Sequence, residues 1–105
     1  MKADRARVVA LEDIPNVGKS VAGDLRRIGI RAPRELAGRD PWLLYDTLNR
    51  VTGMRHDPCL LDTFIAAVDF MQGAPARPWW LYTAGRKAAQ AGQPVRTRSP
   101  ARRAR

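Results

Sequence analysis

The chain has 105 residues, 45% of them hydrophobic, and a formal net charge of +9. The length suits one domain, and the apolar fraction is ordinary for a folded one. The apolar runs are too short to cross a bilayer, the first residues lack the apolar stretch of a secretory signal, and a single cysteine excludes an internal disulfide. We therefore expect a cytoplasmic protein that does not associate with membranes.

The positive charge is concentrated at one end of the chain. Residues 86–105 carry seven basic residues and no acidic one, whereas residues 1–85 carry 12 basic and 10 acidic residues. Such a segment attracts polyanions, although a solubilising terminus explains it equally well. From Gln90 onward only small, polar and basic residues and two prolines follow, a composition that cannot bury apolar surface. We predict a folded domain over residues 1–84 and a basic, disordered tail over residues 85–105.

Helical spacing dominates the first part of the chain. Residues 5–13 predict a short helix that Pro15 ends, because proline lacks an amide hydrogen and disfavours helix in the residue before it. A second helix is predicted over residues 19–28, where apolar side chains recur three or four positions apart and Gly29 follows as a stop. Residues 33–36 predict a short helical turn that connects this part to the next.

Two longer helices follow, and both begin with the same signal. Asp40-Pro41 and Asp57-Pro58 each place a capping carboxylate before a proline in the first helical position. The apolar stripe of the second of these helices indicates a buried face, and each helix is followed by a glycine. No stretch shows the period-two alternation of a half-buried strand. We therefore predict an all-α fold, a compact bundle of about five short helices.

The string Leu11-Glu12-Asp13-Ile14-Pro15-Asn16-Val17-Gly18-Lys19-Ser20-Val21-Ala22 resembles the helix-hairpin-helix (SAM-like) motif. Val17 would fill the gap between the two helices. Gly18 has no side chain, so a phosphate oxygen can approach its amide. The amides of Gly18, Lys19 and Ser20 would lie at a helix N-terminus, where the dipole favours an anion. Lys19 adds a charge and Ser20 a hydroxyl donor, so the motif predicts a phosphate contact. A hairpin used only for packing is the alternative.

The turn departs from the DNA-binding form of the motif at Asn16, where that form usually has glycine. Asparagine tolerates a positive φ, so the turn is expected to survive. Its side chain could either crowd a phosphate or donate a hydrogen bond to one. The predicted DNA-binding residues of this turn are Asn16, Val17, Gly18, Lys19 and Ser20.

The later helices can be read as a degenerate second hairpin. Arg55 and His56 would then stand at its tip, in the positions that Lys19 and Ser20 hold in the first, and two such hairpins could follow phosphates on both sides of a minor groove. The simpler interpretation, which we favour slightly, is that Asp57-Pro58 only caps a helix. Arg55 and His56 complete the predicted DNA-binding set.

Other chemistry-bearing residues favour structural roles. His56 and Cys59 suggest a nucleophile, but Cys59 falls in the first turn of a helix, where we expect a small buried hydrophobe whose thiol pKa the helix N-terminus would lower. Two ligands are too few for zinc. We expect no catalytic residue, no metal and no cofactor. Trp79 and Trp80 could stack on bases, but we expect them to close the core, and Trp42 to pack as well.

The pattern as a whole is similar to the small bacterial helix-hairpin-helix proteins of the pathogenicity-locus family, some of which carry a mitomycin-resistance label. The hairpin also resembles the C-terminal domain of TfoX-type competence regulators. The matching residues are Ile14-Pro15-Asn16-Val17-Gly18-Lys19, Asp24-Leu25, Ile28-Gly29-Ile30, Asp40-Pro41, Leu44-Tyr45, Arg55-His56-Asp57-Pro58-Cys59, Ala66-Ala67-Val68 and Trp79-Trp80. The resemblance implies the helical fold and an association with DNA.

The sequence therefore favours a binding protein over an enzyme. We expect it to hold the phosphate backbone of duplex DNA without base specificity, because no segment is rich in side chains that read bases, and we expect a link to DNA repair or damage resistance. The alternative is a protein-protein interaction module with a polyanion-binding tail.

Overall fold

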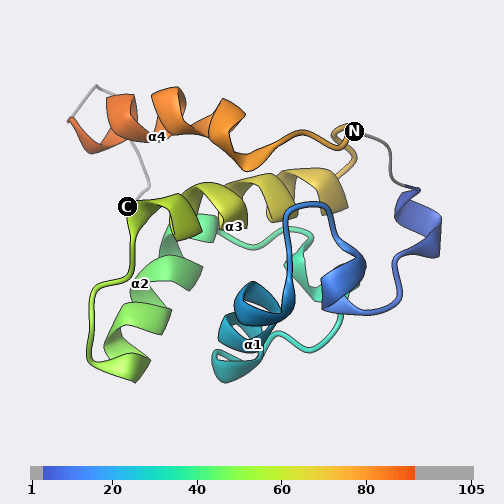
Figure 1. Ribbon diagram of the computed structural model, residues 1–105, viewed down its shortest axis with the longest axis horizontal. Helices are drawn as coiled ribbons and strands as arrows, with labels where there is room; N and C mark the ends of the chain where they lie inside the picture. Colours follow the sequence, from blue (N-terminus) through green and yellow to red (C-terminus); the bar gives the residue numbers. More distant parts are fainter. Residues whose placement is uncertain (1–3, 92–105) are drawn as a thin grey trace.

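Every regular element in the described part of the chain is helical. The computed structural model describes residues 4–91. Its α-helices are α1 (Lys19–Arg27), α2 (Pro41–Thr52), α3 (Pro58–Met71) and α4 (Thr83–Gln90), and its 3₁₀ turns are η1 (Arg5–Arg7), η2 (Leu11–Asp13), η3 (Pro33–Leu36) and η4 (Trp79–Tyr82) (Figure 1). The all-α prediction is confirmed over these residues, with four α-helices in place of about five. None of these helices is both long and apolar enough to cross a membrane.

The starts of α2 and α3 follow the sequence signals. The Asp40 carboxylate accepts a hydrogen bond of 2.9 Å from the Trp42 amide, and the Asp57 carboxylate accepts one of 2.8 Å from the Cys59 amide. Proline occupies the first position of each helix. Gly53 ends α2 with a φ of 70°, a left-handed conformation that favours glycine.

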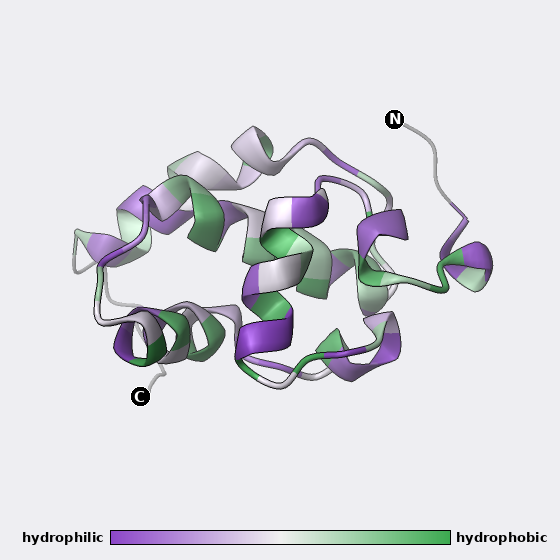
Figure 2. Cartoon of the chain, turned by 60° about the horizontal axis from the view of Figure 1, so that its bottom comes forward, coloured by the Kyte–Doolittle hydropathy of each residue, from purple (hydrophilic) through white to green (hydrophobic). Residues whose placement is uncertain are grey.

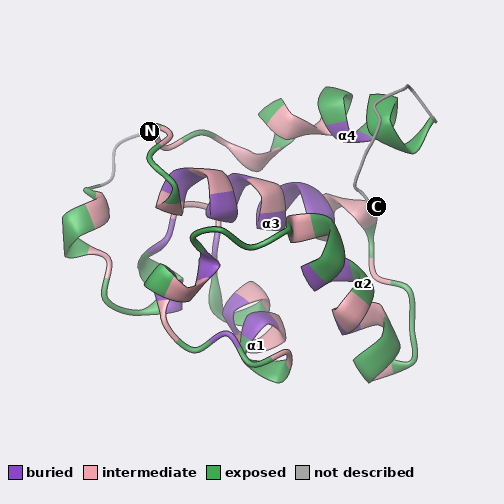
Figure 3. Cartoon of the chain, turned by 180° about the vertical axis from the view of Figure 1, so that it is seen from behind, coloured by how far each residue is buried: buried purple, intermediate pink, exposed green. Residues whose placement is uncertain are grey.

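Helix α3 forms the centre of the core. It lies between α4 on one side and α1 and α2 on the other, and most of its residues are buried (Figures 1 and 3). Phe64 and Leu61 are fully buried, and they join Leu25 of α1 and Leu48 of α2 in one apolar cluster. The other elements are therefore positioned by their contacts with α3.

The N-terminal segment differs from the single helix predicted over residues 5–13. It forms η1 and η2 with extended residues between them. The Asp13 carboxylate accepts hydrogen bonds from the amides of Val9, at 3.1 Å, and Ala10, at 2.9 Å. A side chain that takes these amides competes with the helical pattern. Arg5 anchors the segment to the end of α3, because its guanidinium donates to the carbonyls of Phe70 and Ala74.

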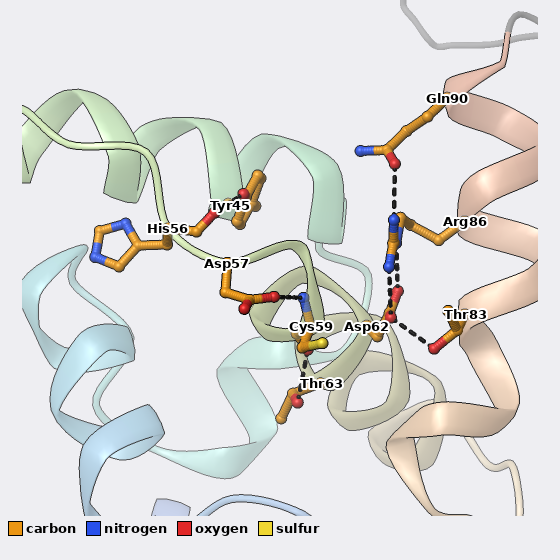
Figure 4. Close-up of polar contacts among 9 residues, drawn as sticks. All are labelled: Tyr45, His56, Asp57, Cys59, Asp62, Thr63, Thr83, Arg86 and Gln90. Carbon is orange, nitrogen blue, oxygen red and sulfur yellow. Dashed lines mark hydrogen bonds and ion pairs between the residues drawn. The ribbon is translucent and has the colours of Figure 1, made fainter.

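The prediction that a disordered tail begins at residue 85 is wrong, because residues 85–90 belong to α4. Arg86 is buried and donates hydrogen bonds of 2.9 and 3.1 Å to the carboxylate of Asp62, which is completely buried in α3 (Figure 4). Thr83 donates to the same carboxylate at 2.8 Å. This buried partner orders a segment whose own composition indicates little burial. The remainder of the predicted tail, residues 92–105, lies outside the described residues.

The tryptophan pair does not close the core as expected. Trp79 is partly buried and meets Trp80 edge to face, with ring centroids 5.8 Å apart. Trp80 is 59% exposed and Leu81 60% exposed. The prediction that both tryptophans are core residues is therefore wrong for Trp80, and Trp42 is also partly exposed.

We predict that Asp62→Ala lowers the free energy of unfolding by about 3 kcal/mol, because it leaves a buried guanidinium without its counter-charge. Urea denaturation followed by circular dichroism measures the loss. The control is Asp46→Ala, which breaks an exposed ion pair with Arg50 on α2 and should cost about 0.5 kcal/mol or less. Equal losses in the two variants would contradict a stabilising role for the buried pair.

Candidate nucleic-acid interface

Two buried side chains hold the turn between η2 and α1 against the core. Ile14 and Val17 are buried in the core, and the Val17 amide donates a 3.0 Å hydrogen bond to the Ile14 carbonyl. Asn16, between them, has a φ of 73°, the positive value that the sequence predicted. Val17 therefore fills the space under the turn and is too deep to be a surface contact.

Helix α1 begins without a side-chain cap. Gly18 is its N-cap residue, no side chain accepts a hydrogen bond there, and the Gly18 carbonyl accepts the 2.9 Å bond from Ala22 that starts the helical pattern. Gly18, Lys19 and Ser20 are all exposed. Figure 2 shows that α1, the helix in front at the centre of that view, carries both hydrophilic and hydrophobic residues. The first amides of α1 are therefore available to a ligand on the surface.

The starts of α2 and α3 offer no such opening. Their aspartate caps already accept hydrogen bonds from first-turn amides, and their first residue is a proline with no amide hydrogen. A carboxylate at this position also repels a second anion. Among these three helices, α1 is the one whose start has the chemistry of an anion site.

The side chain of Asn16 has a different role from either of the two expected. Its amide nitrogen donates a 2.7 Å hydrogen bond to the Arg77 carbonyl, and its oxygen accepts one of 3.2 Å from the Trp79 amide. Both polar ends are therefore occupied by the connector between α3 and η4. Asn16 fixes this connector against the turn, and one hydrogen of its amide nitrogen is left without a partner in these two bonds.

An ion pair links the two sides of the turn. Arg26, in the last turn of α1, donates to both carboxylate oxygens of Glu12 in η2, at 2.8 and 2.9 Å. These hydrogen bonds lower the pKa of Glu12 to about 2. The paired geometry holds η2 and α1 in a fixed relation, although both side chains remain partly exposed.

The second predicted tip, between α2 and α3, is built differently. The Asn49 side-chain oxygen lies 2.9 Å from the backbone nitrogen and 2.8 Å from the ring Nδ1 of His56, and the Tyr45 hydroxyl donates to the His56 carbonyl. Arg55 is exposed. In Figures 1 and 2 this turn lies at the edge of the molecule, away from the η2–α1 turn. The structure therefore does not bring the two groups of predicted site residues together.

The surroundings of Cys59 do not activate its thiol. Cys59 is partly buried, and its hydrogen bond with Asp57, together with burial, raises the pKa of the thiol. Cys59 is therefore less buried than expected, and the pKa of its thiol shifts in the direction opposite to the one expected. The main reason is the Asp57 carboxylate that caps α3, because its hydrogen bond with the thiol favours the protonated form of Cys59.

Comparison with known proteins gives two matches. Residues 4–88 match the family described as pathogenicity locus. The mitomycin resistance protein McrB of Streptomyces lavendulae is 51% identical over 83 residues, which cover 79% of each chain. No solved structure matches the chain.

The Glu12–Arg26 pair predicts a specific loss of stability in acid. A carboxyl whose pKa is lowered in the folded state stabilises it above the unfolded pKa, and this contribution is lost as the pH falls through the folded pKa. For Glu12 the contribution disappears between its ordinary value of 4.5 and about 2. We expect Glu12→Gln to reduce the fall in melting temperature across this range, with Asp46→Asn as control. An unchanged pH profile in Glu12→Gln would contradict the prediction.

Proposed function

The chain belongs to the pathogenicity locus family, and from this premise we propose that it binds the sugar-phosphate backbone of DNA through the η2–α1 turn. In this proposal η2, the turn and α1 act as a helix-hairpin-helix unit that holds the duplex without base specificity. A bacterial protein with this partner works in the cytoplasm, and we propose that compartment.

The observation that carries the proposal is the open start of α1. A Cβ built on Gly18 would meet no atom within 4 Å, so a phosphate oxygen has a free approach to the exposed amides. Helix N-termini of this kind bind phosphates through their amides and the helix dipole. Lys19 adds a positive charge at the same point, and Ser20 adds a hydroxyl that can donate a hydrogen bond.

The composition of α1 supports binding without base specificity. Its nine residues, KSVAGDLRR, include no asparagine or glutamine to pair with adenine. Its arginines lie in the last turn, and Arg26 is already paired with Glu12. Backbone contacts position a protein on DNA but carry no sequence information. Arg55 would add a more distant backbone contact, whereas the Nδ1 atom of the His56 ring is already bound by Asn49.

The name of the Streptomyces relative, mitomycin resistance protein, is the reason to propose a link with damage resistance. The second candidate function is a protein-interaction module, and the exposure of Leu43, Trp80 and Leu81 favours it, with exposed fractions of 57, 59 and 60%. The basic C-terminal segment would then serve only as a site for polyanions.

We predict that Gly18→Asp separates binding from stability. Aspartate is a better N-cap than glycine by a few tenths of a kcal/mol, and its carboxylate would occupy the amides offered to phosphate. The unfolding free energy should stay equal or rise slightly, while affinity for random-sequence duplex DNA falls by about tenfold or more. Fluorescence anisotropy with labelled duplex measures the affinity, and urea denaturation measures the stability.

The matched control is Gly23→Asp, which makes the same change of charge inside α1, where a Cβ also has open space. Its affinity for duplex should fall much less. An affinity that Gly18→Asp leaves unchanged in a folded protein would remove the turn from the binding surface and favour the protein-interaction module.

A further inference from the structure

A groove follows one side of α2 and is separate from the η2–α1 turn. Its α2 residues are spaced three or four positions apart, and α3 and the end of α4 complete its walls. The groove has a volume of about 560 Å³, within the range of small-molecule sites. The residues that matter for its chemistry are Trp42, Asp46, Asn49, Arg50, Arg55 and Gln90.

Two amide side chains in the groove have their oxygens already engaged. The Asn49 oxygen accepts from the backbone and ring of His56, at 2.9 and 2.8 Å. The Gln90 oxygen accepts a 2.9 Å hydrogen bond from Arg86, whose guanidinium is held by Asp62. Figure 4 shows the Gln90 nitrogen turned away from Arg86 and towards α2. With both oxygens engaged, the amide nitrogens of these two lining residues are the groups left to donate hydrogen bonds to a ligand.

Two guanidinium groups add further donors. Arg55 is exposed and forms no ion pair within the described part of the chain. Arg50 lies 3.2 Å from Asp46, but both side chains are more than 60% exposed, and such a pair holds its partners weakly. Asp46 is the one acidic residue on the lining. The polar lining therefore carries two guanidinium groups and two amide nitrogens against one carboxylate, which suits an anion with several acceptor oxygens.

The other end of the groove is aromatic. Trp42 is 37% exposed and precedes Arg50 by eight residues, which is about 12 Å along the helix. An aromatic ring that is accessible in this way can stack on another ring. The long side chains of Arg50 and Arg55 can extend from the opposite end towards a ligand that lies against Trp42.

From this arrangement we propose that the groove binds a nucleoside phosphate, with the base against Trp42 and the phosphate among Asn49, Arg50, Arg55 and Gln90. The group can belong to a free nucleotide or to the 5′ end of a DNA strand, because the recognised chemistry is the same. The site does not use the amides of α1, so it stands independently of the proposed binding of duplex backbone.

The test is a titration of the full chain with dAMP, followed by the NMR signal of the Trp42 indole N–H. We expect dAMP to shift this signal and to bind about tenfold or more tightly than adenosine or inorganic phosphate alone, because each lacks one of the two contacts. Gln90→Glu keeps an oxygen for Arg86 but replaces the donor with an anionic acceptor. It should weaken dAMP binding by about tenfold or more, as should Arg55→Ala.

The matched control is Gln72→Glu. Its side-chain oxygen accepts a 2.7 Å hydrogen bond from the Gly38 amide, so the same substitution keeps that bond but lies outside the groove. It should change dAMP affinity by less than about twofold. Gly18→Asp should leave dAMP binding unchanged, which separates failure of this site from failure of the turn.

Two hairpin DNAs that differ only in a 5′-phosphate identify the source of the ligand. A preference for the phosphorylated hairpin that Gln90→Glu removes would assign the strand end, and equal affinity for both would assign the free nucleotide. A Trp42 signal that dAMP does not move, or dAMP affinity that both Gln90→Glu and Arg55→Ala leave unchanged, would overturn the proposal.

Discussion

The first amides of an α-helix have no partner within the helix, and the starts of α1, α2 and α3 treat these amides in two different ways. At α2 and α3 the carboxylates of Asp40 and Asp57 accept from those amides, so these helix ends are closed. At α1 a glycine without a side chain stands in the same position, and its neighbours Lys19 and Ser20 are exposed. An open helix start costs stability unless something else satisfies it. The proposed phosphate contact is the function that this difference supports best.

The turn that presents α1 is rigid because contacts from distant parts of the chain hold it. Asn16 binds the connector before η4 through both ends of its amide, and the Glu12–Arg26 pair joins η2 to the end of α1. On the opposite side of α3, the Asp62–Arg86 pair fixes α4 and with it the position of Gln90. Sites whose donors are held in place before binding lose less entropy when a ligand arrives. The same contacts that stabilise the fold therefore prepare both proposed surfaces.

What the sequence predicts well is what local chemistry determines. The two Asp-Pro starts, the η3 turn and the positive φ of Asn16 depend on neighbouring residues, and the structure has all of them. What it predicts poorly depends on distant partners. From the sequence alone, Arg86 looks like part of a basic tail. In the structure it pairs with Asp62, an acidic residue within the apolar run of α3. That buried acid was the available signal for α4. The role of the Asn16 side chain had no such signal, because its partner lies 61 residues further along the chain.

The most direct test of phosphate binding at the start of α1 is the response of the α1 amides to DNA. A 15N-labelled sample titrated with random-sequence duplex reports each backbone N–H separately, and phosphate binding at a helix start acts on those groups. If the start of α1 binds phosphate, the amide signals of Gly18, Lys19 and Ser20 shift together and saturate, and added salt reverses the shift, as expected for backbone contacts. Shifts confined to other residues, with these three amides unchanged at saturation, would contradict it.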